Sequence, residues 1–201
     1  MNRLPYEIVV FISMCAWSVF HSWLAAFSTK NLAVRIFGKG IQRYYRLLFI
    51  GVAVLTLLPI LGMVAFLPSR NLWIIPFPWL YLTLTLQGLA LLGLVVTVLQ
   101  VDTMAFIGLS QLHHPDAEQK AEMVTRGFYR WVRHPLYFFS LVLFWLFPVM
   151  TTVSLAFVIA SSLYFVIGTL PEERKLVDIY GQAYRQYQRD VPRIIPWKKI
   201  R

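Results

Sequence analysis

Two short polar segments in the C-terminal half carry side chains that can hold or activate a small molecule. The first reads Arg133-His134-Pro135-Leu136-Tyr137 and combines a guanidinium, an imidazole and a phenol. The second opens with Pro171-Glu172-Glu173 and supplies two carboxylates. Guanidinium and carboxylate groups bind oppositely charged ligand groups, and an imidazole exchanges a proton near neutral pH. The segments therefore predict a site for a charged small molecule, with membrane-surface anchoring of two helices as the alternative.

A C-terminal helix is predicted to begin at the second segment. Pro171 suits the first helical turn, and the carboxylates after it favour a helix N-terminus. Further along, residues at spacings of three and four share one face, namely Glu173, Leu176, Tyr180, Tyr184 and Tyr187. This face predicts one wall of a pocket, whereas the alternative is an interfacial helix with an aromatic belt.

A long apolar stretch separates the two polar segments. Residues 135–171 contain no Asp, Glu, Lys or Arg. One helix of that length would measure about 55 Å, against a hydrocarbon core of ~30 Å. We therefore expect a hairpin with arms at 136–149 and 152–170, the first of them short for a full span. Such a hairpin returns both polar segments to the same membrane face, where they would line one pocket.

The composition indicates a membrane protein. Of the 201 residues, 58% are hydrophobic and 14% are charged, whereas soluble domains have about 25% charged residues. Uncharged stretches at 8–27, 47–67 and 78–101 are long enough to cross a bilayer. The sequence predicts an all-α integral membrane protein with about five transmembrane helices, the last two a short hairpin, plus a cytoplasmic connector and a C-terminal helix. We expect one domain, 1–201, comprising a three-helix part (1–101), the connector (102–134), and the hairpin with its tail (135–201).

The basic residues predict the orientation. Segments 28–46, 102–134 and 172–201 hold 17 of the 19 Lys and Arg residues. Since such residues stay on the cytoplasmic side, the N-terminus is expected outside and the C-terminus in the cytoplasm. The net charge of +10 then indicates anionic lipid as a partner, and no nucleic acid. No metal is expected, because the chain has one Cys and adjacent residues such as His113 and His114 rarely converge on one ion.

In this order, the motifs resemble the isoprenylcysteine carboxyl methyltransferase superfamily of membrane enzymes. RHPLY, an apolar hairpin, EERKL, YGQAYRQY and VPRIIP follow one another within residues 127–196. Phosphatidylethanolamine N-methyltransferases share this outline. Four segments narrow the resemblance to NnrU-type proteins, a group that includes methanethiol S-methyltransferases. They are 20–25, 45–48, 102–111 and 145–151.

This resemblance implies a methyltransferase that uses S-adenosyl-L-methionine, in a bacterial inner membrane. The resemblance places His134, Pro135, Glu172 and Glu173 at the cofactor, and we expect Tyr137, Tyr180 and Tyr184 to form walls for its adenine. Arg133 or His134 would take the cofactor carboxylate, and the Glu pair would accept from its ribose hydroxyls or ammonium group. Because a thiol reacts as the thiolate, a cation or base would assist, and the candidate catalytic residues are Arg133, His134 and Arg193.

Two more residues are weaker candidates for contact with the substrate. His21 lies within the first span, where ionisable groups are costly and often functional. Phe139 stands where the family has Gly, and we expect it to narrow the cofactor pocket or the substrate tunnel.

Several functions remain open on the sequence. The methyl acceptor could be a small thiol, a prenyl-cysteine carboxylate or a lipid amine. One alternative is an NADPH-dependent membrane reductase of the sterol-reductase type, and another is a non-catalytic NnrU-like membrane protein. The sequence does not indicate an oligomeric state.

Overall fold

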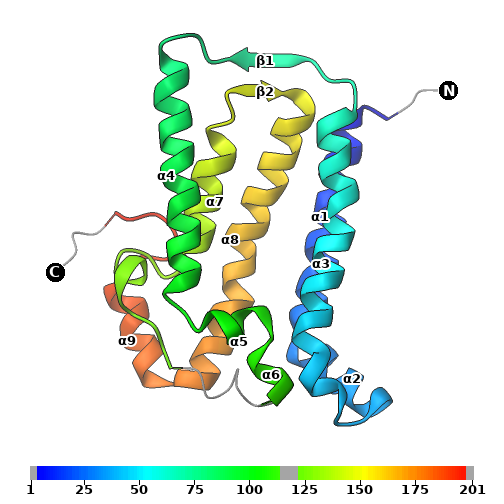
Figure 1. Ribbon diagram of the computed structural model, residues 1–201, viewed down its shortest axis with the longest axis vertical. Helices are drawn as coiled ribbons and strands as arrows, with labels where there is room; N and C mark the ends of the chain where they lie inside the picture. The colour runs from blue at the N-terminus through cyan, green and yellow to red at the C-terminus, as the bar shows by residue number, and fades with distance from the viewer. Residues whose placement is uncertain (1–3, 114–121, 198–201) are drawn as a thin grey trace. The chain divides into compact units, whose positions relative to one another are not determined.

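A computed structural model describes residues 4–113 and 122–197 as helices joined by short connections (Figure 1). His114, the neighbour of His113, lies outside the described residues. Contacts divide the chain into two compact units, which are described separately. The first comprises 1–70, 102–121 and 152–161, and the second comprises 71–101, 122–151 and 162–201.

In the first unit, two long helices pack against each other. α1 (Tyr6–Ala25) and α3 (Ile41–Phe66) are linked by α2 (Phe27–Phe37). Trp17 Nε1 of α1 donates to Thr56 Oγ1 of α3 at 3.0 Å. Residues 71–101 belong to the second unit. The first unit is completed by the short helices α5 (Thr103–Ile107) and α6 (Ser110–His113) and by the start of α8 (Thr152–Tyr180).

The second unit holds the two polar segments. Its helices are α4 (Trp79–Leu99), the 3-10 turn η1 (Gly127–Arg130), α7 (Pro135–Trp145), the rest of α8, and α9 (Gln182–Asp190). α4 and α7 lie side by side (Figure 1). Two short strands, β1 (Asn71–Ile74) and β2 (Val149–Thr151), pair antiparallel with Trp73 opposite Met150. These strands were not predicted, because residues 71–77 read as the entry of the next span.

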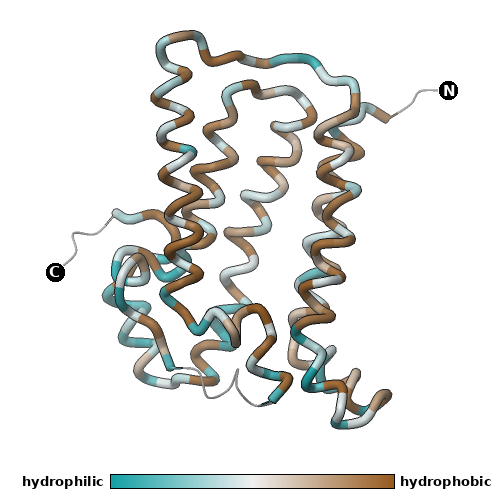
Figure 2. Tube along the Cα trace, viewed as in Figure 1, coloured by the Kyte–Doolittle hydropathy of each residue, from teal (hydrophilic) through white to brown (hydrophobic). Residues whose placement is uncertain are grey.

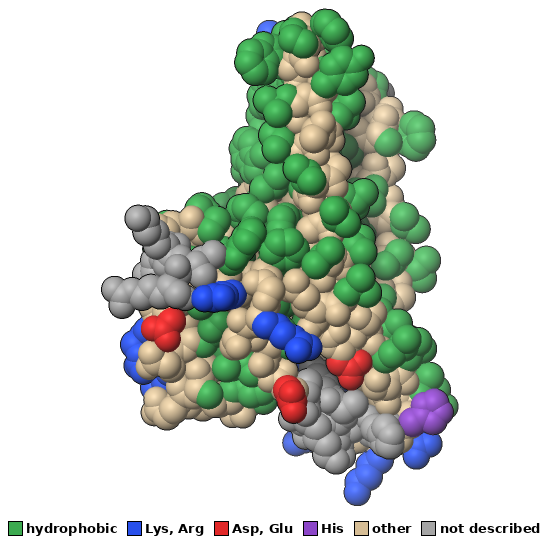
Figure 3. Space-filling model, turned by 60° about the vertical axis from the view of Figure 1, so that its left-hand side comes forward, with side chains coloured by type: hydrophobic (Ala, Val, Ile, Leu, Met, Phe, Trp, Pro, Cys, Tyr) green, Lys and Arg blue, Asp and Glu red, His purple; other side chains and the backbone are tan. Residues whose placement is uncertain are grey.

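The predicted class, an all-α integral membrane protein, is confirmed. Among the described residues, four helices are long and apolar enough to cross a membrane: α1, α3, α4 and α8. Their hydrophobic character is visible in Figure 2. In Figure 3 hydrophobic side chains are spread over the upper part of the drawn face, whereas most of its charged side chains lie in the lower part. α7 has 11 residues and is therefore about 16 Å long, roughly half of a hydrocarbon core.

The predicted hairpin is present between α7 and α8. α7 ends at Trp145, and α8 begins at Thr152 after β2. Trp145 Nε1 donates to Ser162 Oγ at 3.1 Å, which joins the two arms. The chain therefore turns within the predicted stretch.

The predicted start of the tail helix at Pro171 is wrong. Pro171 lies inside α8, which is 29 residues long and continues to Tyr180. Membrane helices tolerate an internal Pro when neighbouring groups satisfy the freed backbone. The break comes instead at Gly181, whose φ of 58° is accessible to glycine. Consequently Glu173 and Tyr184 lie on different helices.

Candidate functional site

A buried ion pair joins the start of α7 to the C-terminal part of α8. Arg133 Nε and Nη2 each lie 2.8 Å from Glu173 Oε1. The two side chains are 7% and 6% exposed. Charged hydrogen bonds of this length are strong, and a buried pair holds only when its remaining polar atoms are also satisfied.

The remaining donor group of Arg133 binds the end of α9. Arg133 Nη1 donates to the carbonyl oxygens of Gln188 at 2.8 Å and Val191 at 2.6 Å. The backbone N–H groups of Arg133 and His134 donate to the carbonyls of Pro192 and Arg193 at 2.9 and 3.0 Å. All three guanidinium nitrogens therefore have protein partners, and Arg133 clamps three segments together.

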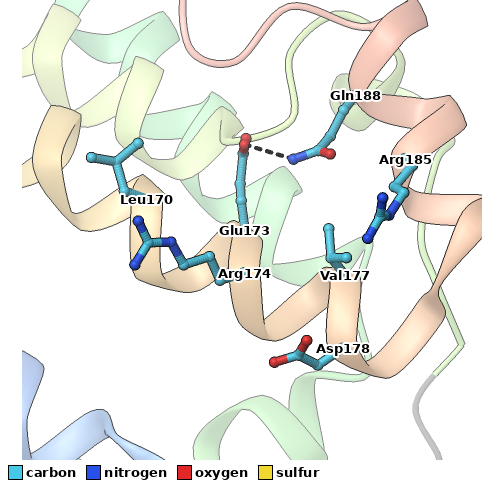
Figure 4. A pocket seen from close by; sticks show the side chains of 7 residues that line it. All are labelled: Leu170, Glu173, Arg174, Val177, Asp178, Arg185 and Gln188. Carbon is cyan, nitrogen blue, oxygen red and sulfur yellow. Dashed lines mark hydrogen bonds between the residues drawn. The ribbon is translucent and has the colours of Figure 1, made fainter.

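Both oxygens of Glu173 are engaged by the protein. Oε1 also lies 3.2 Å from His134 Nε2 and 3.7 Å from Arg193 Nε. Oε2 accepts from Gln188 Nε2 at 2.9 Å (Figure 4). Gln188 escaped the sequence analysis, although its place four residues after Tyr184 puts it on the same side of α9. Glu173 thus positions its neighbours and has little capacity left for a ligand.

Glu172 is the more open carboxylate. Its side chain is 44% exposed, and Oε2 lies 3.5 Å from His134 Nδ1. The Tyr137 hydroxyl donates to the same oxygen at 2.8 Å. The Tyr137 ring in turn stacks on His134 and on Phe165, with centroid distances of 5.4 and 5.0 Å. This leaves Glu172 Oε1 as an acceptor held at a fixed place beside two aromatic rings.

Buried phenols complete the cluster. The Tyr187 hydroxyl donates to the backbone oxygen of Tyr129, whereas the Tyr184 hydroxyl is buried with no hydrogen-bond partner among the described residues. Burial, with the nearby charge of Glu172, raises the pKa of Tyr129 to about 12. Burial likewise raises the pKa of Tyr184 and of Tyr187. All three phenols therefore stay protonated near neutral pH, and the unpartnered one is a donor available to a ligand.

Most of the predicted site residues come together in the second unit. The cluster includes Arg133, His134, Tyr137, Glu172, Glu173 and Arg193. Pro135 is buried as the first residue of α7, which sets the direction in which His134 enters the helix. Tyr180 is half-buried as the last residue of α8, and Tyr184 follows in α9.

Phe139 and His21 lie elsewhere. The Phe139 ring packs on α4, where a Cβ added at Gly93 would meet its ring atoms at 2.5–2.7 Å. Each residue of an α-helix is rotated by about 100° from the one before it. Because Phe139 follows Tyr137 by two residues, it points to the opposite side of α7. His21 belongs to the first unit, with its ring 4.7 Å from Trp17 and 4.8 Å from Phe49. Among the described residues, no group of three His, Cys, Asp or Glu side chains is placed to hold a metal.

The family described as "Protein of unknown function (DUF1295)" matches residues 5–191. Methanethiol S-methyltransferase 1 of Bradyrhizobium diazoefficiens is 32% identical over 196 residues, which cover 96% of this chain and 67% of the relative. Methanethiol S-methyltransferase of Pseudomonas deceptionensis is 42% identical over 86 residues, or 40% of this chain and 33% of the relative.

A third relative, the methanethiol S-methyltransferase of Crocosphaera subtropica, is 41% identical over 73 residues, or 36% of this chain and 29% of the relative. The aligned part of this chain thus spans about two thirds of the Bradyrhizobium relative and about a third or less of the other two. No solved structure matches.

Proposed function

We propose that this chain, which belongs to the DUF1295 family, is a membrane methyltransferase that methylates a small thiol with S-adenosylmethionine. The observation that carries the proposal is the cluster around Glu173, where the two polar motifs meet at a buried ion pair. The relatives whose names specify methanethiol methylation support the choice of reaction.

The residues present fit the proposed cofactor. S-adenosylmethionine carries a carboxylate, an ammonium group, two ribose hydroxyls and an adenine. Glu172 offers a half-exposed carboxylate to the hydroxyls or the ammonium group, and the unpartnered Tyr184 hydroxyl offers a buried donor. Tyr137, with Tyr180 and Tyr184, supplies aromatic walls for the adenine. Glu173 and His134 act mainly by holding this arrangement, because most of their polar atoms already have protein partners.

Arg193 is the cation best placed to attract the acceptor. Its side chain is 42% exposed and keeps Nε 3.7 Å from Glu173, whereas Arg133 is enclosed by its own partners. A cation near a thiol lowers the free energy of the thiolate, which is the reacting form. His134 is the second catalytic candidate, but its two ring nitrogens face Glu173 and Glu172, which favours a positioning role for it.

When bound, S-adenosylmethionine supplies an electrophilic methyl group. The acceptor would enter as the thiolate after losing its proton to bulk water, and transfer of the methyl group would yield a thioether and S-adenosylhomocysteine. The contribution of the chain is to fix the two reactants in line and to exclude water, which lowers the barrier mainly through orientation.

The site would face the cytoplasm. The polar segments lie among the basic segments that the positive-inside rule assigns to that side. We accordingly place the N-terminus outside a bacterial inner membrane and the C-terminus inside it. Reporter fusions after residues 40, 70 and 201 test this orientation, since only the fusion after 70 should report an external location.

A methyl-transfer assay tests the reaction. The detergent-purified chain is incubated with methanethiol and S-adenosylmethionine labelled in its methyl group, and dimethyl sulfide is measured in the headspace. We expect labelled product from the wild type and from Glu122→Gln, which removes an exposed carboxylate outside the cluster. Glu172→Gln should give about tenfold less product at limiting cofactor. Label that appears only on a prenyl-cysteine substrate, or on no acceptor, would contradict the proposal.

A further inference from the structure

A cavity lies between α8 and α9, beside the cluster around Glu173. It has a volume of about 370 Å³, within the range of about 300–1,000 Å³ typical of small-molecule sites. Figure 4 shows its lining side chains, which come from α8 and α9. They are Leu170, Glu173, Arg174, Val177, Asp178, Arg185 and Gln188.

This cavity is distinct from the group around Glu172. Leu170, Arg174 and Val177 recur at helical spacing and so share one face of α8. Glu172 lies two residues from both Leu170 and Arg174, and therefore points to nearly the opposite side. Only Glu173 and Gln188 belong to both places, and a hydrogen bond of 2.9 Å joins them (Figure 4).

The charge of the cavity favours a singly charged anion. Among the described residues, no ion pair or side-chain hydrogen bond engages Arg174, Arg185 or Asp178. The charge of Glu173 is already balanced by Arg133. Two free guanidinium groups and one free carboxylate leave one net positive charge. An anionic phospholipid headgroup, whose single phosphodiester charge has no compensating cation, matches this balance better than a dianionic phosphate or a zwitterionic headgroup of zero net charge.

An exposed apolar stripe leads along α8 to the cavity. Leu163, Ile167 and Leu170 are 46%, 60% and 44% exposed and recur at spacings of four and three residues, with Arg174 four residues further on. Val166, 51% exposed, lies beside them. The same helix face therefore changes from apolar to cationic within one turn. A phospholipid has the matching arrangement, with an apolar acyl chain next to a charged headgroup.

We infer that this face binds an anionic phospholipid, with its phosphodiester between Arg174 and Arg185 and an acyl chain along Leu163, Ile167 and Leu170. This site goes beyond the proposed methyl transfer and does not depend on it. The lipid would link α8 to α9, and so would support the position of Gln188 beside Glu173.

Native mass spectrometry of the detergent-purified chain, with added phosphatidylglycerol or phosphatidylcholine, tests this inference. We expect phosphatidylglycerol to bind the wild type more tightly than phosphatidylcholine. Arg174→Gln/Arg185→Gln should weaken phosphatidylglycerol binding about tenfold or more, the effect of losing hydrogen bonds to a charged group. The control Arg35→Gln/Lys39→Gln removes two exposed charges outside the cavity and should bind like the wild type.

Other outcomes would overturn the assignment. Equal loss in the control and the cavity variant would show a general charge effect. Inorganic phosphate that competes fully at millimolar concentration, with no preference between the two lipids, would identify free phosphate as the ligand. If the double variant does not fold, Arg185→Gln alone is used, and wild-type affinity in that variant would also overturn the inference.

Discussion

Arg133 and Glu173 lie 40 residues apart in the sequence, yet two guanidinium nitrogens of Arg133 contact a single oxygen of Glu173 at 2.8 Å. Around this contact the structure gathers His134, Gln188 and Arg193. The pair therefore connects α7, α8, α9 and the segment after α9. It separates two adjacent carboxylates by role, since Glu173 holds the protein together and Glu172 remains open to a ligand.

Glu173→Gln should destabilise the fold. The substitution leaves the buried Arg133 guanidinium without its countercharge, and breaking one partner of a buried pair costs about 3 kcal/mol or more. Thermal and denaturant unfolding in detergent measure this loss. Glu122→Gln is the control, because its carboxylate is exposed, and it should unfold like the wild type. An unchanged unfolding free energy for Glu173→Gln would contradict the positioning role.

Glu172→Gln should instead reduce ligand affinity and leave stability unchanged within about 0.5 kcal/mol. Because the side chain is 44% exposed, loss of its negative charge should change the free energy of unfolding little. Affinity for S-adenosylhomocysteine should fall about tenfold, as expected when a charged acceptor becomes neutral. Calorimetric titration gives the affinity. Full affinity in this variant would remove Glu172 from the proposed cofactor site.

Gly93→Ala should destabilise the packing of α4 on α7. A Cβ at this position would lie 2.5–2.7 Å from the Phe139 ring, and overpacking of this kind costs about 1–3 kcal/mol. Gly88→Ala on the same helix is the control, since nothing lies within 4 Å of a Cβ there. In a Phe139→Ala background the cost of Gly93→Ala should disappear. A cost that persists there would show that Phe139 is not the obstacle.

Tyr184→Phe should leave the unliganded protein as stable as the wild type. Its hydroxyl has no partner among the described residues, so removing it breaks no hydrogen bond. Tyr187→Phe is the matched comparison and should cost about 1 kcal/mol, because that hydroxyl donates to Tyr129. S-adenosylhomocysteine affinity should fall severalfold in Tyr184→Phe. A stability loss equal to that of Tyr187→Phe would mean that the hydroxyl is already bonded.

The membrane class and the hairpin could be predicted because they depend on the lengths of the apolar stretches and on the positions of the charged residues that bound them. The meeting of the Arg133 and Glu173 motifs followed from the hairpin, which returns both to one face. The break at Gly181 was missed because the charged residues after Leu170 resemble the start of a new helix, although the backbone continues. A Gly flanked by Tyr180 and Gln182 is a helix-ending signal that outweighs Pro171 here.

For other features the sequence pattern does not single out one residue among several. Gln188 is one of several polar residues on a hydrophilic helix, and only the fold selects it as the partner of Glu173. The packing of Phe139 against Gly93 depends on which faces of α7 and α4 meet. One chain gives no information on that pairing, so Phe139 was assigned to the pocket or the tunnel on its sequence position alone.

The most direct test of the proposed function is calorimetric titration of the detergent-purified wild-type chain with S-adenosylhomocysteine and, separately, with NADPH. We predict micromolar binding of S-adenosylhomocysteine, weakened in Glu172→Gln, and no binding of NADPH. Binding of NADPH alone would contradict it and favour a membrane reductase. Binding of neither ligand to the folded protein would also contradict it, and would leave a non-catalytic membrane protein.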